Sequence, residues 1–185
     1  LIEGGRTDLN IEIEVLREIH RDDLARMKGG ATELPLQSLL KIDVDQFHGI
    51  EFSEFPARIA ETAMWMMDHI MNTQASLAFG AAFLRIPLRK SPAITHGDAL
   101  ELDWQALLPA ERCSYIIGNP PFVGAKYQSE FQRAQVRRIA GLGKSGGTLD
   151  YVAAWFLKAA RYGQGHKVPF AFVSTNSITQ GEQVA

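Results

Sequence analysis

Four groups of polar or conformationally restricted residues follow short apolar stretches of the sequence. They are Glu51, Asp98, the run Asn119–Phe122 and residues 174–176. In open α/β sheets, ligands bind at the carboxyl ends of the strands. A carboxylate there can accept hydrogen bonds from the hydroxyls of a ribose, and another can accept from an exocyclic amine. Together these residues predict a nucleoside pocket.

The run Asn119-Pro120-Pro121-Phe122 is the most specific of these groups. Asn-Pro alone is a common turn starter, and a lone carboxylate is more often a helix cap or a solvated charge. The side-chain oxygen of Asn119 and the carbonyl of Pro120 are two acceptors for the protons of an adenine amino group. They can direct the nitrogen lone pair at an electrophile. The prolines restrict the loop, and Phe122 can stack on the base.

Strands separated by helices have to position these groups. Because two consecutive prolines cannot donate to a ladder, a strand must end at Gly118. The alternation of strands and helices predicts an α/β fold with a mostly parallel sheet and flanking helices. Strands are predicted over residues 47–52, 93–100 (with the following loop), 114–118 and 169–173, and helices over residues 9–27, 53–71 and 148–162.

Apolar spacing in two of these helices predicts the faces that they bury. In the helix that begins after Ser53 and carries Pro56 in its first turn, the predicted stripe is Ile59, Ala63, Met67, Ile70 and Met71. In the helix over residues 148–162 the predicted face is Val152, Trp155, Phe156 and Ala159.

Length and composition predict one globular domain. The chain has 185 residues, 46% of them hydrophobic, and a net charge of −2, which excludes a disordered chain or a uniformly basic one. Its one cysteine, Cys113, excludes an internal disulfide and a cysteine zinc site. The five histidines show no ligand spacing, so no metal is expected. No stretch of 18 apolar residues occurs, and a cytoplasmic protein without a membrane span is predicted.

Residues 124–147, named the basic segment, differ from the rest of the chain in charge. Five basic residues stand against Glu130, a local net charge of +4. A solvated flexible loop is one interpretation; an arm that contacts DNA phosphates beside a flipped adenine is the one we favour. The candidate DNA-binding residues are Lys126, Arg133, Arg137, Arg138 and Lys144.

Residues 141–146 match the spacing of a dinucleotide-binding fingerprint. They follow the helix-like stretch FQRAQVRRIA rather than a strand, so the required context is missing. The same glycines resemble the end of a phosphate loop, but the glycine needed five residues earlier is Arg138. Neither motif is taken as functional.

The Asn119–Phe122 run resembles the catalytic motif of N6-adenine DNA methyltransferases. The stretches FHGIEFSEFPARIAETAMWMMDHIMN, FLRIPLRKSPAITHGDALELDW and YIIGNPPFVGAKYQ resemble the methyltransferase domain of MmeI-like enzymes, which join methylation and restriction in one polypeptide. The resemblance covers roughly residues 10–180. It implies an incomplete Rossmann-like class I fold, S-adenosylmethionine as methyl donor and double-stranded DNA as partner.

By position, the resemblance also implies roles for single residues. Glu51 would bind the ribose hydroxyls of the donor and Asp98 its adenine amine, with Phe52 and Ala99 lining the adenine. The residues that would handle the target adenine are Asn119, Pro120, Pro121 and Phe122.

The sequence departs from the family pattern at both ends. No strand with a glycine-rich loop precedes the first helix, and the later strands and the target-recognition domain are absent, so residues 1–185 are expected to be a partial catalytic domain. We expect this isolated piece to be inactive and the parent protein to carry the activity, with nuclease and target-recognition domains possible in the same polypeptide. The alternatives are a protein glutamine methyltransferase, which typically has tyrosine at the position of Phe122, and a non-catalytic DNA-binding or subunit-contact module.

Overall fold

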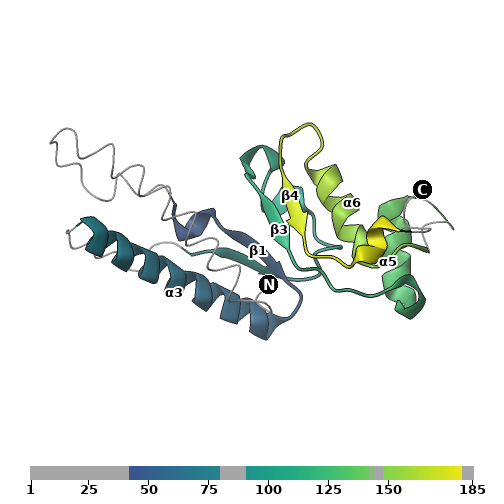
Figure 1. The fold of residues 1–185 in the computed structure, drawn as a ribbon, viewed down its shortest axis with the longest axis horizontal. Coiled ribbons are helices and arrows are strands. Elements are labelled where there is room, and N and C mark those ends of the chain that lie inside the picture. Colours follow the sequence, from purple (N-terminus) through teal and green to yellow (C-terminus); the bar gives the residue numbers. More distant parts are fainter. Residues whose placement is uncertain (1–41, 80–90, 142, 144–147, 181–185) are drawn as a thin grey trace. The chain divides into compact units, whose positions relative to one another are not determined.

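The computed structural model describes residues 42–79, 91–141, 143 and 148–180, and the helix predicted over residues 9–27 lies outside them. The chain divides into two compact units, Leu1–Gly49 with Ser53–Thr95 and Ile50–Phe52 with His96–Ala185. The strands are β1 (His48–Glu51), β2 (Ala93–His96), β3 (Ile116–Gly118) and β4 (Phe170–Phe172) (Figure 1). The helices are α3 (Glu54–Phe79), α4 (Trp104–Leu107), α5 (Glu130–Ala140) and α6 (Ala153–Tyr162). Among them, no helix is both long and apolar enough to cross a membrane.

Strands β1 and β2 pair in parallel. The amide of Ala93 donates to the carbonyl of Phe47 at 2.9 Å, and the amide of Gly97 donates to the carbonyl of Glu51 at 2.8 Å. From the first of these bonds to the second, the residue numbers rise along both strands. The strands therefore run in the same direction, and the carboxyl ends of β1 and β2 lie side by side. This places the predicted residues at the ends of the two strands on one edge.

Strands β3 and β4 form a second parallel pair, in the register Ile116 with Phe170 and Gly118 with Phe172. The amide of Val173 continues the ladder by donating to the carbonyl of Gly118 at 3.0 Å. The ladder stops there because the next residues include two prolines, as predicted. Within the described residues the strands make two separate pairs, whereas the sequence predicted one mostly parallel sheet; no described strand bridges the two pairs.

Helix α3 continues eight residues beyond the predicted end at Met71. No proline or glycine stops it there, and the hydroxyl of Thr73 bonds back to the carbonyl of His69 at 2.8 Å within the helix. The predicted buried stripe is wrong at Ile59 and Ile70, which are 49% and 41% exposed, whereas Ala63, Met67 and Met71 are half-buried. A different face turns inward, which buries Ala57 and Asn72, and the Asn72 amide is satisfied by Asp68 one turn earlier.

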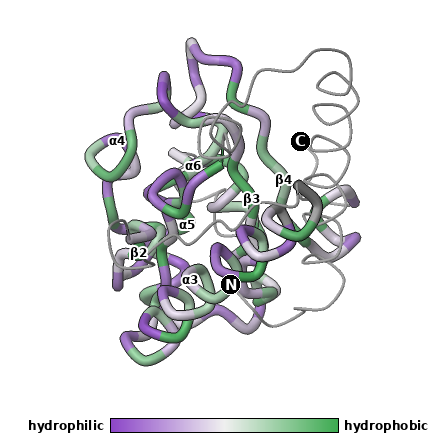
Figure 2. The backbone as a smooth tube through the Cα atoms, turned by 90° about the vertical axis from the view of Figure 1, so that its left-hand side faces the viewer, coloured by the Kyte–Doolittle hydropathy of each residue, from purple (hydrophilic) through white to green (hydrophobic). Residues whose placement is uncertain are grey.

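Helices α5 and α6 build the core of the second unit. They pack against each other, and the core side chains are Leu100, Val136, Ile139, Tyr151 and Ala154. Helix α6 also contacts β4, since the ring of Phe156 lies 5.2 Å from that of Phe172 in an edge-to-face arrangement. Hydrophobic and hydrophilic residues alternate along both helices (Figure 2), as expected for helices with one covered face.

Helix α6 begins five residues after the predicted start at Thr148, because residues 148–152 form turns. The amide of Ala153 closes one of them on the carbonyl of Asp150 at 3.0 Å. The predicted apolar face of the helix is confirmed at Val152 and Ala159, which are fully buried, while Trp155 and Phe156 are half-buried.

Candidate active site

Residues 97–103 follow β2 and are named the β2 loop. Asp98 closes this loop on itself: its carboxylate Oδ1 accepts from the amide of Leu100 at 2.8 Å, and its main-chain carbonyl accepts from the amides of Glu101 and Leu102, both at 3.0 Å. An aspartate that bonds to the backbone two residues later is a common turn former. The predicted ligand residue Asp98 is therefore also the residue that shapes its own loop.

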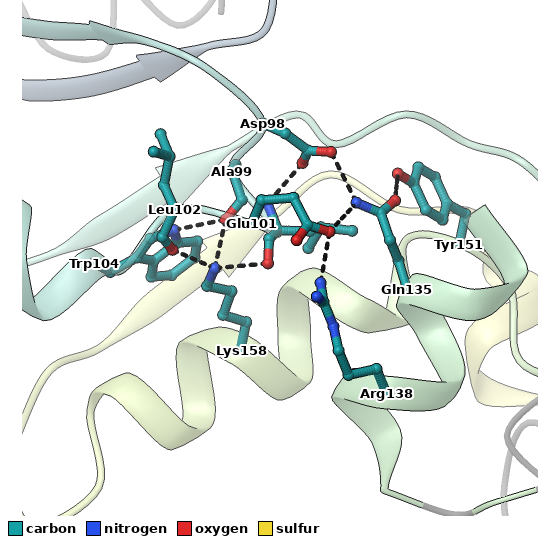
Figure 3. Close-up of polar contacts among 10 residues, drawn as sticks. Asp98, Ala99, Glu101, Leu102, Trp104, Gln135, Arg138, Tyr151 and Lys158 are labelled. Atoms are coloured by element: carbon teal, nitrogen blue, oxygen red, sulfur yellow. Dashed lines mark hydrogen bonds and ion pairs between the residues drawn. The ribbon is translucent and has the colours of Figure 1, made fainter. Parts of the chain in front are cut away.

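The second carboxylate oxygen of Asp98 is held by Gln135 of α5. The Gln135 side chain is only 3% exposed, and its Nε2 donates to Asp98 Oδ2 at 2.8 Å and to Glu101 Oε1 at 2.6 Å. The hydroxyl of Tyr151 donates to Gln135 Oε1 at 2.6 Å (Figure 3). One buried amide thus connects two carboxylates of the β2 loop with the residues before α6.

Glu101 is paired in addition with Arg138 of α5, at 2.5 Å between Oε1 and the guanidinium. The hydrogen bonds from Arg138 and then from Gln135 hold the pKa of the Glu101 carboxyl below its usual range. Arg138, predicted to contact DNA, is therefore engaged with the β2 loop, although its side chain is still 59% exposed.

Lys158 of α6 holds the β2 loop from another side. Its Nζ donates to the main-chain carbonyls of Ala99, Leu100 and Leu102 at 2.7, 2.9 and 2.6 Å (Figure 3). Burial lowers the pKa of this ammonium, and the nearby carboxylates of the β2 loop oppose that shift. Lys158 Nζ lies over the ring of Trp104, 5.4 Å from the ring centroid. The Nε1 of Trp104 donates to the carbonyl of Ala99 at 2.9 Å.

Glu51 and Phe52 lie at the end of β1, beside the β2 loop. The bond from the Gly97 amide to the Glu51 carbonyl brings the two chain segments together. Phe52 is 71% exposed, so its ring is available to a ligand. The structure thus gathers the four predicted donor-binding residues, Glu51, Phe52, Asp98 and Ala99, at one strand edge.

Residues 119–123 follow β3 and are named the β3 loop. Pro120 is buried, whereas Asn119 and Phe122 are exposed, Phe122 by 47%. Among the described residues none forms a hydrogen bond with the side chain of Asn119. The side chain of Asn119 thus lies exposed directly after β3, with no bond to the part of the chain that the structure describes.

The β3 loop is anchored just after this run. The amide of Tyr151 donates to the carbonyl of Val123 at 2.9 Å, and the buried carboxylate of Asp150 accepts from the amide of Ala125 at 2.9 Å. The hydroxyl of Ser177 donates to the other oxygen of Asp150 at 2.6 Å. Ser177, which follows residues 174–176 after β4, thus helps to hold the carboxylate that anchors the β3 loop.

Tyr151 links the two loops. Its main-chain amide holds the β3 loop and its hydroxyl holds Gln135, which binds Asp98. Burial, reinforced by the charges of Asp98 and Glu101, raises the pKa of Tyr151 to about 12, so the hydroxyl remains a donor at neutral pH.

The described part of the basic segment forms a short turn, η3 (Ala125–Tyr127), and helix α5, rather than a flexible loop. Ser129 and Gln132 cap the start of α5 reciprocally, and Gly141 ends it in the left-handed conformation with φ +69°. These signals are local, but the sequence was interpreted only as helix-like over residues 131–140, and no helix was predicted there.

The five predicted DNA-binding residues fall into different environments. Lys126 and Arg137 are exposed. Arg133 is mostly covered and donates to the carbonyls of Ala125 and Gln128 at 3.4 Å. Arg138 is paired as described above, and Lys144 lies outside the described residues.

Four residues that hold the β2 and β3 loops were not predicted from the sequence. They are Gln135, Asp150, Tyr151 and Lys158. Only Gln135 left a signal: it is a polar residue beside Val136 on the face of α5 that also carries Ile139. A buried polar group must be hydrogen-bonded, and that requirement could have marked it.

Short parallel strand pairs with flanking helices define an α/β protein, in which Glu51 ends β1, and Asp98 and the Asn119–Phe122 run follow β2 and β3. A family model described as MmeI, DNA-methyltransferase domain, matches residues 6–185. The chain belongs to this family, which confirms the resemblance seen in the sequence.

Two known proteins show the extent of the similarity. The chain is 35% identical over 147 residues to DNA methyltransferase A of Bacillus subtilis (strain 168), covering 78% of the chain and 17% of that protein. It is 50% identical to a solved structure of the Type IIL restriction-modification enzyme MmeI in complex with DNA, with a TM-score of 0.77, covering 94% of the chain and 22% of that protein. The chain thus spans about a fifth of the length of each.

Proposed function

We propose that the intact protein is a cytoplasmic, site-specific DNA methyltransferase within a restriction-modification enzyme. It transfers a methyl group from S-adenosylmethionine to N6 of adenine in double-stranded DNA, on a Rossmann-like class I domain. Membership of the MmeI methyltransferase family supports this proposal. The observation that carries it is the exposed side chain of Asn119, which has no hydrogen bond from the described residues and directly precedes the buried Pro120.

The β3 loop handles the target base. An adenine flipped out of the duplex donates its two amino protons to the side-chain oxygen of Asn119 and to the carbonyl of Pro120. Two fixed acceptors draw the nitrogen lone pair out of conjugation with the ring and orient it for attack. Phe122 stacks on the base, which contributes about 1–3 kcal/mol. Orientation of this kind can supply about 7–11 kcal/mol of the barrier reduction, so no general base is required before attack.

The donor site fits the chemistry of S-adenosylmethionine, which supplies an electrophilic methyl group when bound. An ionised carboxylate has about four acceptor positions, and Asp98 uses two of them for Leu100 and Gln135, so it can still accept from an adenine amine. Glu51 binds the ribose hydroxyls from the adjacent strand end, and the exposed ring of Phe52 lines the adenine together with Ala99.

The basic segment binds the phosphates of the duplex. Lys126 and Arg137 make the direct contacts because both are exposed. Arg133 and Arg138 hold the segment in place through bonds within the chain and add positive charge. Lys144 completes the set. These contacts position DNA without reading its sequence, so they weaken with salt.

Labelled-methyl transfer tests the proposal. The intact protein is incubated with labelled S-adenosylmethionine and duplex DNA, and the DNA is digested to nucleosides. Label in N6-methyl-2′-deoxyadenosine is the expected result, and it should disappear in Asn119→Ala. Label in protein glutamine instead of DNA would support a glutamine methyltransferase. DNA binding without any transfer would indicate a non-catalytic module.

A further inference from the structure

Both amide protons of Gln135 and its side-chain oxygen take part in hydrogen bonds. Its Nε2 has two protons, one for Asp98 Oδ2 and one for Glu101 Oε1, and its Oε1 accepts from Tyr151. The side chain is 3% exposed and lies among the core residues Val136 and Ile139. A buried amide in this position is costly unless each bond is made, so its orientation is strongly determined.

The carboxylates of Asp98 and Glu101 decide which way the amide faces, because they can only accept, and the Tyr151 hydroxyl completes that arrangement by donating to Oε1. The bond from Tyr151 to Gln135 Oε1 is 2.6 Å long. If the amide were turned over, its oxygen would face Asp98 and Glu101, and three acceptors would meet without a proton between them. The native orientation is therefore the one in which Gln135 donates to both carboxylates (Figure 3).

The consequence for Asp98 is a fixed carboxylate plane. Leu100 holds Oδ1 at 2.8 Å and Gln135 holds Oδ2 at 2.8 Å, from opposite ends of the group. Gln135 and Arg138 also bind Glu101, and they compensate its negative charge, which would otherwise repel that of Asp98. Asp98 thus keeps its remaining acceptor positions pointing in a determined direction.

We propose that Gln135 is a positioning residue, which aims the Asp98 carboxylate at the 6-amino group of the donor's adenine and thereby sets the preference for a 6-amino purine. The inference rests on the donor-binding role of Asp98 in the proposed function. A 6-oxo purine presents an acceptor where adenine presents a donor, so a correctly aimed carboxylate rejects it. Gln135 touches neither the target base nor the methyl group.

Binding of two donor analogues to the intact protein tests this inference. Calorimetry gives the Kd of S-adenosylhomocysteine and of its 6-oxo counterpart S-inosylhomocysteine. The unchanged protein should prefer the 6-amino compound. In Gln135→Met, which keeps the side-chain volume but removes the donors, the affinity for S-adenosylhomocysteine should fall about tenfold, while that for the 6-oxo compound changes little.

Two further variants keep the test decisive. Tyr151→Phe removes only the hydroxyl that bonds to Gln135 Oε1 and helps to hold the amide in place, so it should reduce the same preference by a smaller factor, and it decides the question if Gln135→Met does not fold. Gln164→Met changes an exposed glutamine and should leave both affinities unchanged. An undiminished 6-amino preference in the Gln135 and Tyr151 variants would overturn the inference. An unchanged protein that binds neither analogue would instead overturn the proposed donor site, and the inference with it.

Discussion

The β2 loop and the β3 loop both follow short parallel strands, but they differ in how the candidate functional side chain is held. The side chain in the β2 loop is bound by other residues, whereas that in the β3 loop is exposed. In the β2 loop, both oxygens of Asp98 are bound and three main-chain carbonyls accept from Lys158. In the β3 loop, the side chain of Asn119 has no hydrogen bond from the described residues, and the loop is anchored through main-chain groups further on.

The number of acceptor positions explains this difference. A carboxylate can bind two donors of the protein and still accept from a ligand, so side chains from α5 and α6 can fix it directly. An amide oxygen has only two lone pairs, so one bond to the protein would leave a single acceptor position and fix its direction. The β3 loop is instead made rigid by Pro120 and Pro121, which leaves the Asn119 amide available.

The largest expected effect separates the two loops by function. Asn119→Ala should lower the rate of methyl transfer at least a hundredfold, since a group that acts on the reacting atom typically contributes about 10²–10³ in rate. The Kd of S-adenosylhomocysteine should remain the same, because the β2 loop is intact. Transfer rates and calorimetry check both expectations. A loss of donor affinity in the same variant would show that donor binding and handling of the target base are not separated between the two loops.

The next effect concerns the support of the β2 loop. Lys158→Met leaves the carbonyls of Ala99, Leu100 and Leu102 without their shared donor, which should reduce the free energy of unfolding by about 1–3 kcal/mol. Urea denaturation measures this change. Lys167→Met, at an exposed position, is the matched control and should change stability by less than about 0.5 kcal/mol. Equal stabilities of the two variants would contradict the role given to Lys158.

A smaller effect distinguishes two neighbouring arginines. Arg137 is exposed, whereas Arg138 is paired with Glu101. Arg137→Ala should reduce the slope of log K for DNA binding against log salt by about 0.9, the value for one lost phosphate contact. Arg138→Ala should reduce the slope less and weaken donor binding instead. Equal slopes for the two variants would show that Arg138 also contacts phosphate.

The smallest effect is the pH dependence of the β2 loop. The folded-state pKa of Glu101 lies below the ordinary value of a glutamate, which is that of the unfolded chain, so its stabilising contribution is fully present above that ordinary value and is lost as the pH falls through the folded-state pKa. Because the group is exposed, the change is small. Urea unfolding between pH 6 and pH 3 should show a shallower loss of stability in Glu101→Gln. An identical slope in both proteins would mean that the pair with Arg138 contributes nothing measurable.

Local sequence signals were sufficient to predict where β3 ends and to mark most of α5 as helix-like, although α5 was not among the predicted helices. The paired prolines stop β3 at Gly118, and the capping box at Ser129 and the glycine at position 141 bound α5, because each signal acts within a few residues. The length of α3 and part of its buried face were predicted wrongly, since an amphipathic pattern does not say which side neighbouring elements cover.

The sequence alone determined which residues could do the chemistry: the carboxylates at two strand ends and the run Asn119–Phe122. Only the tertiary structure decided what holds them. Gln135 reaches Asp98 across 37 residues, and Lys158 reaches Ala99 across 59. Contacts at such separations exist only once α5 and α6 have packed beside the β2 loop, and the free energy of that packing is distributed over the whole core rather than encoded at any one position.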